Sequence, residues 1–146
     1  MIKLSPGKNL GMRRISDEAG IFKMTAVDQR PPIINPIKKY FDDKNKVWNE
    51  VSKFKKLLVE NLQDSSSALL LDPHYAIPTS MDILKSNKGL IVTLEDSKFD
   101  ENNLGRSSKI IDNWSVSKIK RMGADAVKVL AWYRHCLLYT SPSPRD

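Results

Sequence analysis

The chain has 146 residues, of which 40% are hydrophobic, and its formal net charge is +7. That hydrophobic content suffices for a packed core and argues against wholesale disorder, and no apolar run approaches the roughly 20 residues of a membrane span. The opening residues lack the apolar segment of a secretory signal, so we expect a soluble, cytoplasmic protein with no membrane partner. Cys136 is the only cysteine, which excludes an internal disulfide and a multi-cysteine metal site.

The positive charge does not follow the pattern of a nucleic-acid-binding protein. The 24 Lys and Arg residues are interleaved with 17 Asp and Glu residues, without a long run of like charges. Nucleic-acid binding normally requires a clustered basic stripe. We predict that Lys38-Lys39, Lys55-Lys56 and the stretch 118–121 form solvated helix faces, and that the chain has no nucleic-acid partner.

The first part of the chain predicts a strand, a break and a long helix. Residues 22–27 form a mostly apolar run, and Pro31 and Pro32, which follow closely, argue against a simple helix there. Residues 47–62 predict an amphipathic helix, because apolar side chains recur at spacings of three and four. These apolar positions are Val47, Val51, Phe54, Leu58 and Leu62.

Apolar strands then alternate with polar, helix-forming stretches. We predict strands at 68–71, 89–94 and 126–133, a short helix at 80–85, a loop at 96–109 and a helix at 116–122. Ser115 is the expected N-cap of the last helix, and Gly123 is expected to end it. Continuous apolar strands alternating with helices are typical of a parallel sheet covered by helices, so the fold class is α/β. About four such βα units make the N-terminal half of an eight-stranded (β/α)8 TIM barrel.

The last eleven residues, 136–146, differ in composition from the rest of the chain. They resemble the translation of a common sequencing adaptor, residue by residue. The alternative is a native Pro/Ser-rich linker. We expect a partial TIM-barrel domain at 1–135 and a non-native tail at 136–146, in which case Cys136 has no function.

Charged and polar residues follow three of the predicted strands. Asp28-Gln29-Arg30 follows the first, Asp72 the second and Glu95 the third. Ligands of parallel α/β proteins bind beyond the carboxyl ends of strands, so we expect these acids along one rim of the sheet. Each acid can also be an ordinary cap or turn residue, as Asp72 before Pro73 illustrates. As a cluster they suit either a divalent cation or acid/base chemistry on a small substrate, and spacing alone does not decide.

Lys128 is the most specific single signal. It is the third residue of the last predicted strand, beside Val127 and Val129. An interior lysine is costly unless it is paired, and burial makes an amine easier to deprotonate, which suits Schiff-base or general-base chemistry. The alternative is a lysine with a buried stem and an amine that reaches solvent at the rim.

Several segments in order resemble the tagatose 1,6-bisphosphate aldolase family, which includes relatives acting on sulfofructose phosphate. The segments are 11–20, 26–30, 69–78, 112–115 and 123–128. The resemblance covers nearly all of residues 10–133. The sequence departs from the family pattern at Pro31-Pro32-Ile33, where glycine and a small residue are usual. This departure leaves the identity of the sugar substrate open.

The resemblance implies a class I aldolase that needs neither metal nor other cofactor and acts on a phosphorylated ketose. A lysine forms a Schiff base with the ketose, and cleavage of C3–C4 yields dihydroxyacetone phosphate and an aldehyde, which is glyceraldehyde 3-phosphate for the tagatose substrate. By this pattern Asp28 and Lys128 are catalytic, Lys128 as an accessory lysine. Gln29, Arg30, Asp72 and Glu95 are expected to contact substrate.

The Schiff-base lysine and most phosphate contacts belong to later strands of the family, so we expect the isolated chain to be inactive. The resemblance leaves open whether the full enzyme is a homo-oligomer. The alternative function is a non-catalytic α/β module that binds an anionic partner through its basic surface.

Overall fold

A four-stranded parallel sheet forms the centre of the protein. The computed structural model describes residues 3–102 and 105–132. The strands are β1 (Met24–Ala26), β2 (Ala68–Leu71), β3 (Gly89–Thr93) and β6 (Ala126–Lys128). Their order is β1-β2-β3-β6, and every neighbouring pair is parallel, with Thr25 opposite Leu69, Leu69 opposite Leu90, and Val92 opposite Val127. The predicted α/β class with a parallel sheet is confirmed, and the predicted tail 136–146 lies outside the described residues.

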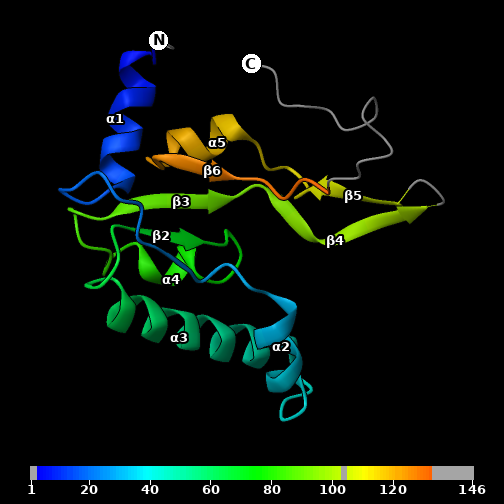
Figure 1. The fold of residues 1–146 in the computed structure, drawn as a ribbon. Helices are drawn as coiled ribbons and strands as arrows, with labels where there is room; N and C mark the ends of the chain where they lie inside the picture. Colours follow the sequence, from blue (N-terminus) through cyan, green and yellow to red (C-terminus); the bar gives the residue numbers. More distant parts are fainter. Residues whose placement is uncertain (1–2, 103–104, 133–146) are drawn as a thin grey trace.

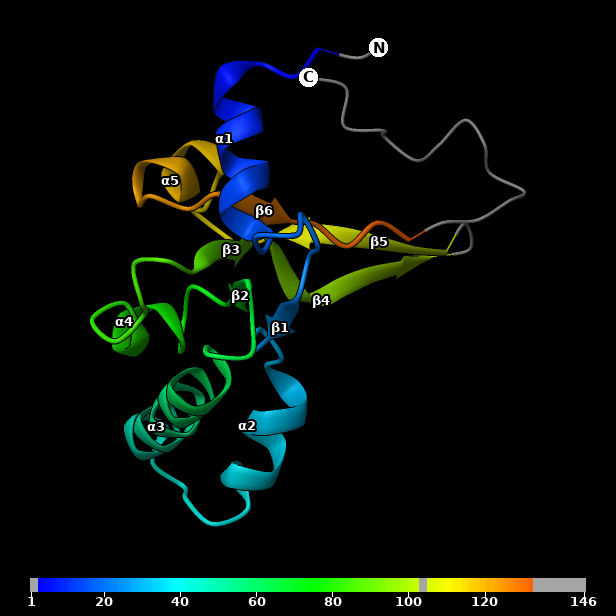
Figure 2. The ribbon, with the colours of Figure 1, turned by 60° about the vertical axis from the view of Figure 1, so that its left-hand side comes forward.

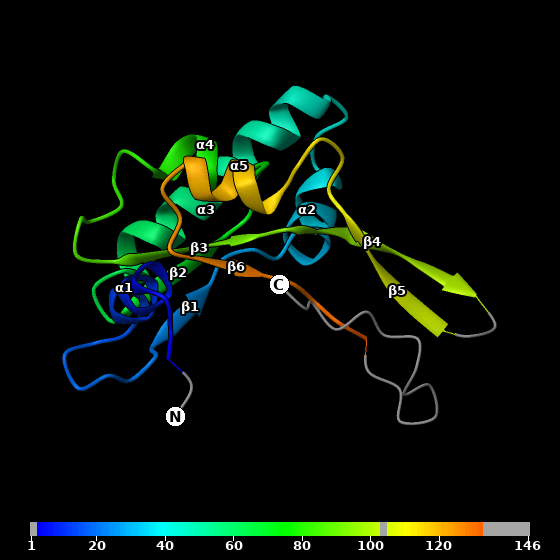
Figure 3. The same cartoon turned by 90° about the horizontal axis from the view of Figure 1, so that it is seen from above.

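Helices cover one face of this sheet. These are α3 (Lys44–Leu62), α4 (Ile77–Ser80) and α5 (Val116–Arg121), which lie on the same side of the strands in Figure 3. Alternate strand residues, among them Leu69, Leu71, Leu90 and Val92, pack with Val59 and Ile119 into the main core. The intervening residues therefore face the opposite side of the sheet.

A further helix, α1 (Pro6–Ile15), lies at the amino ends of the strands (Figure 1). Ile15 packs with Ala68 and Ile91 in a second, smaller core. The approach of the helix to β3 is close, because a Cβ on Gly89 would lie 2.6 Å from the carbonyl oxygen of Arg14. With α1 at the amino ends, the carboxyl ends of the strands are the edge left for a site.

Three local predictions are wrong, and one helix was not predicted. Residues 96–109 are not a loop, because β4 (Glu95–Asn102) and β5 (Gly105–Ile110) form an antiparallel hairpin that extends from the carboxyl end of β3 (Figure 2). The hairpin lacks an apolar alternation because little of it is buried. Pro31 and Pro32 open a helix, α2 (Pro31–Lys38), since the first turn of a helix needs no backbone N–H donors. The ladder of the last strand ends at Lys128 and does not continue over residues 129–132, while residue 133 lies outside the described residues. The short helix is 77–80 rather than 80–85.

The predicted long helix is confirmed, but its buried face differs from the predicted one. Phe54 and Leu62 are 44% and 37% exposed. Val47 and Val51 are buried as predicted, and the other buried side chains are Ser52, Lys55 and Val59. The expectation that Lys55 lies on a solvated face is therefore wrong, because the four-residue spacing that buries the valines also buries this lysine.

Candidate functional site

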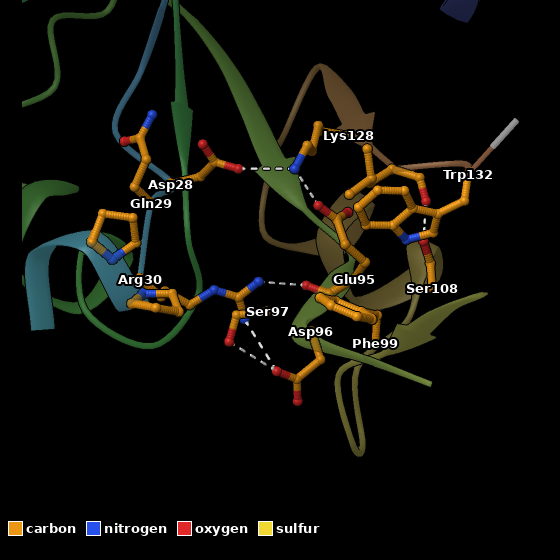
Figure 4. Close-up of a pocket in the computed structure, with 13 residues that line it drawn as sticks. Asp28, Gln29, Arg30, Glu95, Asp96, Ser97, Phe99, Ser108, Lys128 and Trp132 are labelled. Carbon is orange, nitrogen blue, oxygen red and sulfur yellow. Dashed lines mark hydrogen bonds and ion pairs between the residues drawn. The ribbon is translucent and has the colours of Figure 1, made fainter. Parts of the chain in front are cut away.

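A pocket of about 300 Å³ lies at the carboxyl ends of β1, β3 and β6, beside the β4–β5 hairpin. Figure 4 shows its lining side chains converging from these elements. Five of the six predicted site residues line it: Asp28, Gln29, Arg30, Glu95 and Lys128. They meet here because parallel strands bring their carboxyl ends to one edge, although 100 residues separate Asp28 from Lys128.

Lys128, the last residue of β6, lies between two carboxylates. Its Nζ is 3.1 Å from Oδ2 of Asp28 and also donates to Oε1 of Glu95. The same Asp28 oxygen accepts a hydrogen bond of 3.1 Å from the hydroxyl of Thr93, which is fully buried in β3. Thr93 and Lys128 are opposite each other in the β3–β6 register, so the sheet itself fixes this arrangement.

The protonation of Lys128 follows from these neighbours. Burial favours the neutral amine, but the hydrogen bonds and charges of Glu95 and Asp28 outweigh it, so the pKa of Lys128 is raised above 10.5. The side chain is therefore an ammonium at neutral pH. An ammonium can stabilise a developing oxyanion, but it cannot attack a carbonyl until it loses its proton.

Glu95 is 4% exposed and uses only one of its carboxylate oxygens within the described residues. Oε1 accepts from Lys128, whereas Oε2 is buried without a hydrogen-bond partner there. A buried acceptor without a partner is costly, and it suits a hydroxyl donor supplied by a ligand.

Arg30 is also held in place, at only 7% exposure. Its Nη2 donates to the carbonyl oxygen of Glu95 at 2.7 Å, and Nη1 lies 3.9 Å from Oδ1 of Asp96. Burial raises the pKa of Asp96, but hydrogen bonds from Lys98 and Ser97 and the charge of Arg30 outweigh this effect. The pKa is therefore below its ordinary value, and this carboxylate stays ionised. The guanidinium thus joins the first turn of α2 to the start of the hairpin, at the wall of the pocket.

The hairpin side of the pocket is aromatic, which sequence reasoning missed. The rings of Phe99 and Trp132 lie edge to face with centroids 5.5 Å apart, and the guanidinium of Arg106 lies 4.6 and 5.3 Å from them. The sequence predicts a loop at Phe99 and a strand at Trp132. Only the hairpin and the chain beyond β6 bring them together (Figure 4).

Asp72, the sixth predicted residue, lies outside the pocket. It follows β2 on the same rim, as expected, but it is fully buried and turned towards the helices, where it pairs with Lys55 of α3. Its Oδ1 accepts from the backbone N–H groups of His74 and Tyr75 at 2.9 and 2.8 Å. The four-residue spacing of Lys55 from Val51 and Val59 was the signal that could have identified this lysine.

Across residues 3–102 and 105–132, no group of three or more His, Cys, Asp or Glu side chains is arranged to hold a metal ion. In the same part of the chain, no helix is both long enough and apolar enough to cross a membrane.

The sequence has clear relatives among known proteins. Residues 22–136 match the DeoC/LacD family aldolase domain. The chain is 34% identical over 133 residues to tagatose 1,6-diphosphate aldolase 2 of Enterococcus faecalis, covering 91% of this chain and 39% of the relative. It is 35% identical over 130 residues to the tagatose 1,6-diphosphate aldolase of Streptococcus agalactiae, covering 89% and 39%, and 33% identical over 133 residues to that of Listeria monocytogenes, covering 91% and 38%.

The chain therefore spans about 39% of the length of these relatives. Its match to the family domain covers most of its residues, and it includes the strand ends that carry the pocket. The chain belongs to the DeoC/LacD aldolase family.

Proposed function

We propose that this chain forms the N-terminal half of a (β/α)8 barrel and carries part of the active site of a class I ketose-bisphosphate aldolase. The observation that carries the proposal is the Lys128 ammonium held between Asp28 and Glu95 at the carboxyl ends of three parallel strands. Relatives of this chain are named tagatose 1,6-diphosphate aldolases, which supports a tagatose-type ketose bisphosphate as substrate. A phosphorylated sugar of this kind fits a cytoplasmic enzyme.

In this reaction a lysine forms an imine with the C2 carbonyl of the ketose and releases water. When the C3–C4 bond breaks, its electron pair moves towards the iminium nitrogen, and the C4 hydroxyl gives up its proton as the aldehyde forms. We propose that the imine-forming lysine belongs to the part of the barrel that the longer relatives have in addition. Lys128 does not suit that task, because its raised pKa keeps it protonated.

We assign roles to the residues of the pocket by their geometry. The Lys128 ammonium stabilises negative charge on substrate oxygens, and Asp28 fixes the ammonium. The free Oε2 of Glu95 accepts a hydrogen bond from a sugar hydroxyl. Arg30 and Gln29 contact the polar end of the substrate, and Asp72 contributes indirectly, by way of Lys55.

The test is a titration of the chain with tagatose 1,6-bisphosphate, followed by backbone amide shifts in NMR spectra. We expect shifts confined to the ends of β1, β3 and β6, and an affinity that Lys128→Met lowers at least tenfold. Lys120→Met is the matched control, because Lys120 lies exposed on α5, outside the pocket. Inorganic phosphate serves as a second ligand. Equal binding by the two variants, or shifts spread over the basic surface, would favour the anionic-partner module instead.

A further inference from the structure

The most unusual side chain outside the pocket is Lys55. It belongs to α3, in the helix layer, yet it is 0% exposed. Its ammonium makes an ion pair with Asp72, also 0% exposed, and donates to the carbonyl oxygen of Val27 at 2.8 Å. Burying an ion pair requires both charges to lose their hydration, and an apolar pair of the same volume often serves stability equally well. Packing alone therefore gives no reason for a lysine at this position.

The position of its two partners indicates what Lys55 does. The carbonyl of Val27 belongs to the peptide that leads into Asp28, one of the two carboxylates that hold Lys128. The N–H of Val27 is fixed by the carbonyl oxygen of Leu70 at 2.8 Å, so the sheet holds one side of this residue and Lys55 holds the other. Between them the backbone before Asp28 has little freedom to rotate.

Asp72 connects the same ammonium to the end of β2. Its carboxylate accepts from three successive N–H groups, those of His74, Tyr75 and Ala76, and so fixes the turn that follows the strand. The Tyr75 ring lies 5.9 Å from the Lys55 ammonium. The ends of β1 and β2 are thus joined through a single cation that comes from the helix layer.

The surroundings of Lys55 contain the charges of the pocket as well. Burial lowers the pKa of Lys55, the charges of Asp72 and Asp28 raise it, and that of Arg30 lowers it again, with burial the largest effect. The charges of Asp28 and Arg30 therefore both act on the Lys55 ammonium, although Lys55 does not line the pocket. Its ammonium bonds the carbonyl of Val27, the residue directly before Asp28.

We propose that Lys55 is a positioning residue: through the Val27 carbonyl and Asp72 it fixes the ends of β1 and β2, and so places the Asp28 carboxylate against Lys128. The placement concerns this chain alone, whereas its consequence for aldol cleavage rests on the proposed function. Lys55 acts on Lys128 through Asp28 and touches no substrate.

The experiment measures the pKa of Lys128 by following its side-chain NMR signals against pH, with no ligand present. Asp28→Asn sets the scale, because it removes one of the two carboxylates, and it should lower the pKa of Lys128 by about one unit. Lys55→Met alone leaves the Asp72 carboxylate buried without its partner, which can unfold the chain. The decisive variant is therefore Lys55→Met with Asp72→Asn, which removes both charges of the buried pair together, compared with the wild type.

In the double variant the amide oxygen at position 72 can still accept from the N–H groups of His74 and Tyr75, whereas the donor to the Val27 carbonyl is lost. We expect the double variant to lower the pKa of Lys128 by at least half the Asp28→Asn effect. Lys56→Met, a control at the neighbouring, partly exposed lysine that pairs with Asp82, should leave it unchanged. A folded double variant whose Lys128 titrates as in the wild type would overturn the proposal. Because no sugar is involved, that failure is distinct from a failure to bind tagatose 1,6-bisphosphate.

Discussion

Gly89→Ala should displace α1 from the amino ends of the strands. Gly89 opens β3, and a Cβ there would lie 2.6 Å from the carbonyl oxygen of Arg14 and 2.8 Å from Cα of Ile15, where ordinary contact begins at 3.4 Å. Both atoms belong to backbone, so no side-chain rotation relieves the overlap. The last turn of α1 must move away from the sheet.

The displacement affects specific contacts. The hydroxyl of Ser67 donates to the carbonyl oxygen of Ile15 at 2.7 Å, and Ile15, 6% exposed, covers Ala68 and Ile91. Overpacking of this kind costs about 1–3 kcal/mol. With a central value of about 2 kcal/mol, a chain of this size loses about 4–8 °C in Tm.

The assay is thermal and urea unfolding followed by circular dichroism, together with hydrogen exchange over residues 6–15. Gly7→Ala is the matched control, since a Cβ at Gly7 meets nothing within 4 Å. That change should stabilise α1 by about 0.5 kcal/mol, because alanine restricts the unfolded chain. If Gly89→Ala were as stable as the wild type, with unchanged exchange in α1, the docking argument would be refuted.

Three further predictions concern the pocket and the sheet edge. Incubation of the chain with dihydroxyacetone phosphate and borohydride should leave Lys128 unmodified in peptide mass spectra, because its raised pKa keeps it protonated; a stoichiometric adduct there would contradict the accessory role. Glu95→Gln should lower the pKa of Lys128 by about one unit in NMR titrations. In the wild type, the stabilisation from the ion pairs of Lys128 should be intact below pH 10.5 and lost as the pH rises through the folded pKa of this lysine. Met24, 45% exposed in β1, which is the edge strand of the sheet among the described residues, should promote association. Met24→Lys should therefore shift size-exclusion profiles towards monomer, and an unchanged profile would show that this edge is not the contact.

The sequence by itself was sufficient for the sheet and for most of the pocket. The runs at 68–71 and 89–94 are almost entirely apolar, so neither has a polar face that could meet solvent. Such runs are typical of strands buried on both faces, and this pattern predicts a parallel sheet covered by helices. Once the strands are parallel, their carboxyl ends share an edge, which predicts Asp28, Asp72 and Glu95 on one rim, whereas only the resemblance to aldolases placed Lys128 beside them. The resemblance of these segments to known aldolases agreed with that geometry.

The hairpin and its aromatic wall depended on tertiary structure. Residues 96–109 carry mostly polar side chains, so no hydrophobic period distinguishes a solvated hairpin from a loop. The contact between Phe99 and Trp132 follows from the hairpin's pairing with itself and from the chain that leaves β6.

The direction of a side chain just beyond a strand end was likewise decided only by the three-dimensional structure. Asp28 and Asp72 occupy equivalent places after β1 and β2, but Asp28 turns into the pocket and Asp72 turns towards α3. Within a strand, the alternation of faces determines the direction of each side chain. Beyond the last strand residue, the conformation of the turn and the available hydrogen-bond or ion-pair partners determine it. Asp72 turns inward because Lys55 is there to pair with it. Lys55 in turn is buried because the sheet covers its face of α3, and the residue type alone does not reveal this burial.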